Sequence, residues 1–186
     1  YFVYDLNSGS LELIDQDKIK EPYFSPDNTK VAFVKDNNLF FRNLSSKTTT
    51  QVTTDGLNNS VINGVTDWVY EEEFSFVRAF DWSANGKYLA YIKFDESDVP
   101  EFSMDLYGSY GRDLYPSQNV FKYPKAGEKN AKVSLHIYNT KSGKTQKVDL
   151  GDYYYIPRIK WTEKDNILSV QTTNRHQNEL KLHLVN

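Results

Sequence analysis

Apolar and polar residues alternate with a period of two along much of this chain. Short runs rich in Val, Ile, Tyr and Phe follow this pattern, among them "KVAFVKDNNLFFRNL", "KYLAYIKFDE", "KVSLHIYNT" and "NILSVQTTN". Clusters of Asn, Asp, Gly and Ser separate the runs, which is typical of strands joined by tight turns. The pattern therefore predicts an all-β fold.

A longer repeat underlies these strands. The segments "EPYFSPDNTKVAFV", "RAFDWSANGKYLAYI" and "PRIKWTEKDNILSV" each contain a strand with an aromatic residue at its end, a polar turn and a second strand. The aromatic residues are Phe24, Trp82 and Trp161. Four-stranded units stacked radially form β-propellers, with roughly 40 to 50 residues per blade. We predict that residues 1–186 are part of one β-propeller domain, with about three four-stranded blades of a larger ring.

Two insertions lengthen the spacing of the repeat, at about 55–76 and 96–132. Ordered loops of this length usually carry function. The second insertion is rich in aromatic and apolar residues that lie outside the expected blade core, and protein interfaces use such sets. We expect an extended arm that forms an interface, the alternative being an arm folded back over its own blade. The residues concerned are Phe102, Met104, Leu106, Tyr107, Tyr110, Leu114, Tyr115, Val120, Phe121 and Tyr123.

The first insertion contains "TDWVYEEEFSF", which predicts a short helix. Thr66 or Asp67 can cap a helix that runs from Trp68 to about Phe74, with acids in its early turns where the helix dipole favours them. Trp68 and Tyr70 offer apolar anchoring. The three consecutive carboxylates repel one another, so they either form a solvated helix face or meet a cation.

The stretch "DWVYEEEF" resembles the glutamate motif of the dipeptidyl peptidase IV group in the prolyl oligopeptidase family. The likeness extends to "WSANGKYLAYIKFDESDVPEF" and "YPKAGEKNAKVSLHIYNT", and so covers most of residues 63–140. It implies an eight-bladed propeller that caps an α/β-hydrolase domain of the same parent chain. It also implies a serine exopeptidase that removes N-terminal X-Pro or X-Ala dipeptides, and a homodimer formed through the 96–132 arm.

By position, the resemblance assigns Glu72 and Glu73 to the free α-amino group of a peptide substrate. An ammonium group would neutralise the clustered charge through charge-assisted hydrogen bonds. Three consecutive helical positions cannot all face one atom, so we expect Glu71 to face away. The residues expected to support the pair are Asp67, Trp68, Tyr70 and Glu71.

No catalytic residue is assigned in this chain, because it has no Gly-x-Ser-x-Gly segment. We expect no cofactor and no metal site, and we interpret His136, His176 and His183 as strand residues that pack or face solvent. A substrate-binding arginine implied by the family is expected before Tyr1. Two alternatives stay open: a catalytically inactive relative whose propeller serves protein–protein interaction, and an unrelated scaffolding propeller.

Charge and composition add a few limits. The 186 residues carry a formal net charge of −3 with acids and bases mixed, so neither nucleic acid nor an anionic membrane surface is an expected partner. Cysteine is absent, which excludes disulfides and thiol catalysis within the chain. A start at Tyr indicates a fragment. The compartment is not fixed by these residues; a periplasmic or cell-surface bacterial parent is the leading expectation, since secreted eukaryotic relatives usually carry disulfides.

Overall fold

The computed structural model describes residues 1–108, 114–164 and 166–186, and Tyr110 therefore lies outside the described residues. Within them the chain forms sixteen strands and a single helix. In chain order these are β1 (Phe2–Tyr4), β2 (Leu11–Leu13), β3 (Lys20–Phe24), β4 (Lys30–Lys35), β5 (Asn38–Asn43), β6 (Thr49–Gln51), β7 (Val61–Asn63), α1 (Trp68–Phe74), β8 (Phe80–Trp82), β9 (Tyr88–Asp95), β10 (Glu101–Leu106), β11 (Ser117–Lys122), β12 (Lys132–Asn139), β13 (Lys144–Lys147), β14 (Tyr155–Trp161), β15 (Leu168–Thr173) and β16 (Leu180–Val185).

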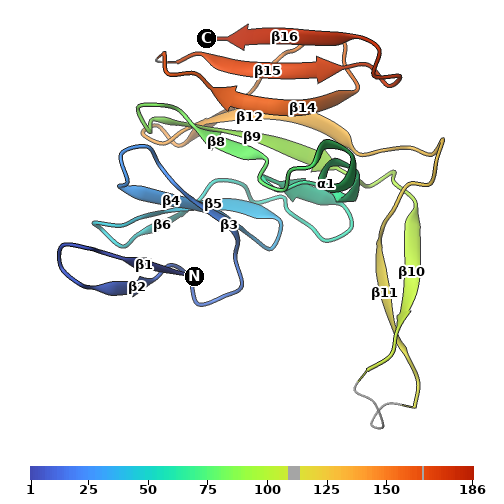
Figure 1. Cartoon of the computed structure of the whole chain (residues 1–186), viewed down its shortest axis with the longest axis horizontal. Coiled ribbons are helices and arrows are strands. Elements are labelled where there is room, and N and C mark those ends of the chain that lie inside the picture. The colour runs from blue at the N-terminus through green and yellow to red at the C-terminus, as the bar shows by residue number, and fades with distance from the viewer. Residues whose placement is uncertain (109–113, 165) are drawn as a thin grey trace.

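Four antiparallel sheets follow one another through the body of the molecule (Figure 1). They are the β1–β2 hairpin, the β3–β6 meander, a sheet of β7, β8, β9, β12 and β13, and the β14–β16 meander. The repeated aromatic residues Phe24, Trp82 and Trp161 are the last residues of β3, β8 and β14, the first strands of their hairpins. The prediction of an all-β chain with one short helix is confirmed.

The third sheet has a first strand that is split in two. Strand β7 pairs with the end of β9, through Val61 opposite Asp95, and β8 pairs with its beginning, through Trp82 opposite Leu89. The backbone between them closes on itself, because Ala79 N donates to Gly64 O over 2.9 Å. Gly64 takes φ +80° at this close approach, a conformation that side chains disfavour. The helix α1 thus interrupts a strand.

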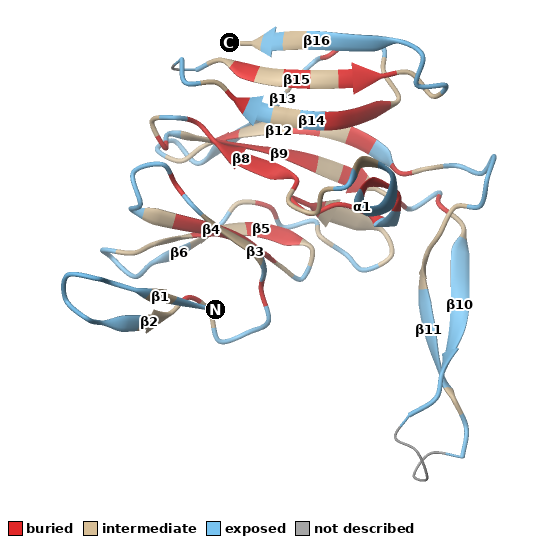
Figure 2. Cartoon of the chain, in the orientation of Figure 1, coloured by how far each residue is buried: buried red, intermediate tan, exposed pale blue. Residues whose placement is uncertain are grey.

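The β10–β11 hairpin leaves the same sheet between β9 and β12. Its two strands pair only with each other, from Glu101 opposite Lys122 to Leu106 opposite Ser117. Every residue of β10 is exposed, and the hairpin projects away from the stacked sheets (Figure 2). Among its described residues, contacts with the body lie toward its root, as in the hydrogen bond that Asn59 Nδ2 donates to Val120 O over 3.1 Å.

Buried residues concentrate in the strands of the stacked sheets, as Figure 2 shows, and their side chains form three clusters. Val31 and Phe33 pack beneath the first hairpin, while Phe41 and Trp82 pack between the second and third sheets. The largest cluster joins the third and fourth sheets to α1, and includes Tyr70, Phe94, Leu135 and Ile156. Within the described residues, α1 is too short to cross a lipid bilayer.

Candidate functional site

Helix α1 has the start and end that its sequence dictates. Asp67 adopts extended backbone angles and its Oδ1 accepts a hydrogen bond from Tyr70 N over 3.0 Å, so Asp67 is the N-cap. Ser75 turns left-handed at φ 56° and ends the helix. Thr66, the other candidate cap, donates instead to Phe76 O over 3.1 Å and joins the segments that precede and follow α1.

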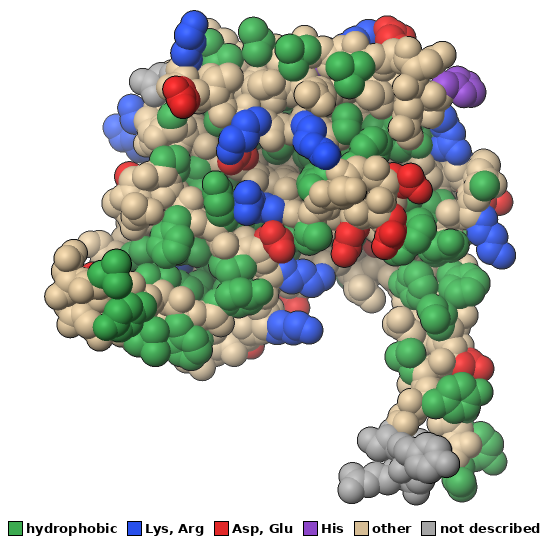
Figure 3. Space-filling model, viewed as in Figure 1, with side chains coloured by type: hydrophobic (Ala, Val, Ile, Leu, Met, Phe, Trp, Pro, Cys, Tyr) green, Lys and Arg blue, Asp and Glu red, His purple; other side chains and the backbone are tan. Residues whose placement is uncertain are grey.

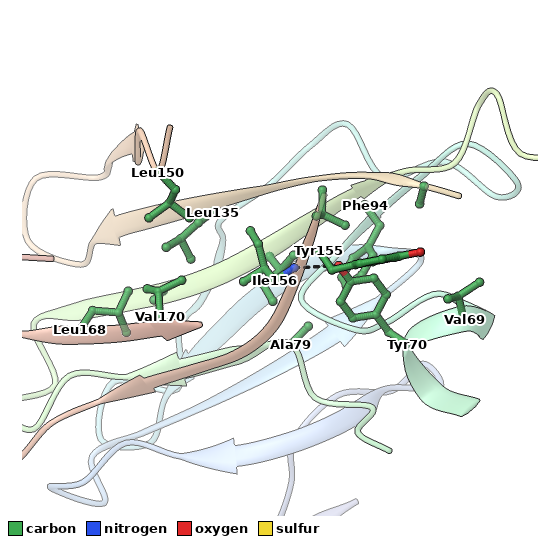
Figure 4. Close-up of a cluster of buried hydrophobic side chains, with 14 of the residues drawn as sticks. Val69, Tyr70, Ala79, Phe94, Leu135, Leu150, Tyr155, Ile156, Leu168 and Val170 are labelled. Carbon is green, nitrogen blue, oxygen red and sulfur yellow. Dashed lines mark hydrogen bonds between the residues drawn. The ribbon is translucent and has the colours of Figure 1, made fainter. Parts of the chain in front are cut away.

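Tyr70 fixes the helix to the body of the protein. Its side chain is 1% exposed, and its hydroxyl oxygen accepts a hydrogen bond from Ile156 N of β14 over 3.0 Å (Figure 4). The rings of Phe74 and Phe94 each lie 4.9 Å from the Tyr70 ring, centroid to centroid. Burial raises the pKa of the Tyr70 hydroxyl well above its ordinary value. The helix is therefore locked to the neighbouring sheet by packing and by one buried hydrogen bond.

Trp68 contacts the other insertion. Its ring packs edge-on against Tyr123, with 4.4 Å between centroids, and Tyr123 follows strand β11 directly. Trp68 remains 38% exposed. Of the two residues expected to anchor the helix, Tyr70 is buried in the core, and Trp68 lies against the root of the hairpin.

Glu71, Glu72 and Glu73 are all exposed on α1. Within the described residues, no Lys, Arg or His nitrogen lies within 4 Å of their carboxylates. Figure 3 shows acidic side chains gathered over α1 with Lys and Arg side chains beside them. Glu73 also lines a groove of about 890 Å³ whose walls include Trp68 and Phe102. The carboxylates are thus accessible to a cation from solution.

Two further acids lie buried near the helix N-terminus. Burial raises the pKa of Asp67 to about 6, and burial together with the charge of Asp67 raises the pKa of Glu96 to about 7. Lys122 lowers the pKa of Glu96 in part, and its Nζ also donates to Val99 O over 2.9 Å. Glu96 belongs to the acidic run "DESD", which gives no sign of burial in the sequence, so the burial of Glu96 was not predicted.

The histidines take structural places. Burial lowers the pKa of His136 to about 4, and its ring stacks on Tyr91 at 5.2 Å. His183 shares a hydrogen bond of 2.8 Å with Thr172. The prediction that His176 lies in a strand is wrong, because it lies in the turn between β15 and β16, where the sheet reverses. Among the described residues, no group of three His, Asp or Glu side chains is placed to hold a metal ion.

Stacked antiparallel sheets, one of them with its first strand split into β7 and β8, define this chain as a β-propeller region. A family model for the N-terminal region of dipeptidyl peptidase IV matches residues 1–186, and the chain belongs to that family.

Known proteins agree with this assignment. The chain is 37% identical over 192 residues to dipeptidyl aminopeptidase B of Saccharomyces cerevisiae, covering all of this chain and 23% of that protein. The crystal structure of Porphyromonas gingivalis dipeptidyl peptidase 4 superposes with a TM-score of 0.93 at 45% identity, covering 99% of this chain and 26% of that one. The chain thus spans about a quarter of the length of these relatives.

Proposed function

We propose that this chain is the substrate-gating part of a dipeptidyl peptidase IV-like serine exopeptidase that removes N-terminal X-Pro or X-Ala dipeptides. In this function Glu72 and Glu73 bind the free α-amino group of the peptide. The observation that carries the proposal is the pair of exposed carboxylates on a helix that the core holds rigidly.

Electrostatics favour an ammonium ligand at this position. Adjacent carboxylates repel each other, and a cation that contacts both relieves the repulsion. An ammonium group can donate three hydrogen bonds, and those to carboxylates are stronger than neutral ones. A peptide with an acetylated N-terminus has lost this charge, so it should bind poorly.

Because α1 is held rigidly, binding of the peptide's amino terminus to its carboxylates would select peptides by the distance from that terminus to the scissile bond. Tyr70 ties α1 to β14, so the carboxylates keep a fixed position relative to the sheets. A hydrolase domain in the parent chain would hold its nucleophile at a fixed distance from them, and only a substrate with two residues between ammonium and scissile bond would react. This chain alone should show no peptidase activity.

The β10–β11 hairpin is proposed to contribute a homodimer contact. Its tip carries exposed apolar side chains, with Tyr107 79%, Leu114 93% and Tyr115 85% exposed. Isolated hairpins of two strands are marginally stable in water, so a covering partner would stabilise it. The same surface serves the alternative function, a catalytically inactive relative that uses its propeller for protein interaction.

The test is steady-state kinetics of the full-length parent on Gly-Pro-4-nitroanilide. Glu72→Gln and Glu73→Gln should each lower kcat/KM by about tenfold to a hundredfold, because each removes a charge-assisted contact worth roughly 1.5 to 3 kcal/mol. Glu163→Gln, an exposed acid in the turn after β14, is the matched control and should leave kcat/KM unchanged. Unchanged kinetics in both helix variants would remove the pair from the mechanism, and a parent without turnover would favour the inactive relative.

A further inference from the structure

A small cationic cavity lies where the third and fourth sheets meet. It has a volume of about 130 Å³. Its lining includes Phe76 and Arg78 from the segment between α1 and β8, Phe80 and Asp81 from β8, and Arg158 and Lys160 from β14. The two sheets are joined here by Asp81, whose Oδ2 accepts from Trp161 N over 2.9 Å. The cavity therefore sits on a fixed junction.

Arg78 and Arg158 have no carboxylate oxygen within 4 Å among the residues that the structure describes. Arg42, on a neighbouring sheet, shows the ordinary arrangement, with its Nη2 2.7 Å and its Nε 3.2 Å from Glu12 Oε1. In the cavity Lys160 Nζ lies 3.1 Å from Asp81 Oδ2, so the carboxylate of Asp81 is already paired with a cation. The two arginines leave the cavity with an uncompensated positive charge.

Aromatic rings hold both guanidinium groups in place. The Cζ of Arg78 lies 3.7 Å from the Tyr23 ring centroid, and that of Arg158 lies 5.1 Å from the ring of Phe76. Stacking on a ring leaves the N–H groups at the edge of the guanidinium plane able to donate. Arg158 uses one of them, donating from Nη1 to Pro157 O over 2.6 Å. A planar anion that accepts two parallel hydrogen bonds, a carboxylate, fits the remaining donors.

The cavity adjoins the glutamate helix. Phe76 lines the cavity and follows Glu73 by three residues; its ring packs 5.9 Å from that of Tyr70. The guanidinium groups of Arg78 and Arg158 and the carboxylates of α1 thus belong to adjoining segments without forming ion pairs with each other, and Figure 3 shows both kinds of side chain on this face. Such a surface is complementary to a molecule that carries an ammonium and a carboxylate at once.

We propose that Arg78 and Arg158 form a carboxylate-binding site for the peptide whose amino terminus is held by Glu72 and Glu73. The inference rests on the proposed function for the identity of the ligand. The carboxylate can come from an acidic first residue or from the C-terminus of a short peptide, because both present the same group.

The test uses the full-length parent and two matched substrate pairs. Asp-Pro-4-nitroanilide and Asn-Pro-4-nitroanilide differ in a side-chain carboxylate, whereas Gly-Pro-Ala-Ala with a free or an amidated C-terminus differs in the terminal one. The wild type should prefer the carboxylate member of one pair by about fivefold to tenfold in kcat/KM, and that pair identifies the source. The Arg78→Gln/Arg158→Gln double variant should lose the preference and keep its kcat/KM for Gly-Pro-4-nitroanilide within about twofold.

Lys141→Gln, an exposed cation in the turn between β12 and β13, is the matched control and should retain the preference. The proposal is overturned if the wild type shows no preference in either pair, or if the preference survives in the double variant. Should the parent not cleave Gly-Pro-4-nitroanilide at all, the proposed function fails separately. Calorimetric binding of the acid and amide forms of Gly-Pro-Ala-Ala, and of Asp-Pro-amide and Asn-Pro-amide, then decides the carboxylate site by the same criterion.

Discussion

Helix α1 and the β10–β11 hairpin are two insertions into one sheet, and they are built in opposite ways. The helix has seven residues, and its buried Tyr70 packs against four aromatic rings and accepts a hydrogen bond from Ile156 N. The hairpin has six residues in each strand, and every residue of β10 is exposed. The helix depends on the core for its position, whereas the hairpin depends on its own ladder.

This difference suits the two insertions to the two roles proposed for them. Side chains that measure a distance must be held by a rigid support, which burial provides. A surface that meets another chain must stay accessible, which the hairpin provides. Substitutions in the two insertions should therefore differ in what they change: stability and geometry in α1, and association in the hairpin.

The largest expected effect is that of Tyr70→Ala. Removing a fully buried aromatic side chain costs about 3 to 5 kcal/mol of unfolding free energy, because it leaves a cavity. Tyr107→Ala in the hairpin, 79% exposed, is the matched control and should change the unfolding free energy by less than about 0.5 kcal/mol when both proteins are measured at a concentration at which the parent is monomeric. Urea unfolding of the parent measures both. Equal effects of the two variants would contradict the contrast between the insertions.

Tyr70→Phe sharpens the same comparison. The ring packing stays, but Ile156 N loses its acceptor in a buried site, which should cost about 1 to 3 kcal/mol. Tyr123→Phe is the control, because no hydrogen bond of its hydroxyl is found among the described residues. If Tyr70→Phe is as stable as the wild type, the buried hydrogen bond does not hold the helix.

A smaller effect is expected from pH at the joint between the two insertions. The folded-state pKa of Glu96, about 7, lies above its ordinary value of 4.5, so the folded protein binds the proton more tightly than the unfolded chain. This contribution to stability is fully present below pH 4.5 and is lost as the pH rises through about 7. Asp67, with a pKa raised to about 6, acts in the same direction.

Glu96→Gln removes the ionisation and should raise the melting temperature at pH 8 while changing it little at pH 5. Thermal unfolding at the two pH values measures the difference, with Glu163→Gln as an exposed control. A larger gain at pH 5 than at pH 8 would show that the sign is wrong.

The smallest effect on stability is expected from removing the hairpin. Replacing residues 103–119 by a short Gly/Ser linker should leave the unfolding free energy of the sheets nearly unchanged, since none of the residues described in this segment belongs to the three buried clusters. The parent should become monomeric by light scattering. A variant that stays dimeric at low micromolar concentration would show that the hairpin is not the main contact.

Much of the local structure follows from the sequence, because it is set by nearby residues. Alternation predicted the strands, and Asp67 with the apolar positions of α1 predicted the helix bounds. The partners of these elements are distant in the chain and leave no local signal. Tyr70 meets Ile156, 86 residues later, and Arg78 meets Tyr23, far earlier.

The split of one strand into β7 and β8 was also beyond the sequence. Each half has three residues, too few for an alternation pattern, and both pair with β9. The candidate site was found through its resemblance to a family motif, whereas the burial of Glu96 emerged only from the fold. The function of Glu72 and Glu73 stays a prediction.

The most direct test of the account compares free and acetylated amino termini. In the parent, kcat/KM is measured for Gly-Pro-4-nitroanilide and its N-acetyl form, in the wild type and in the Glu72→Gln/Glu73→Gln double variant. The account predicts that the wild type prefers the free amine by at least about a hundredfold, and that this ratio falls by at least about tenfold in the double variant. A ratio that is the same in both proteins would show that the carboxylates on α1 do not bind the amino terminus.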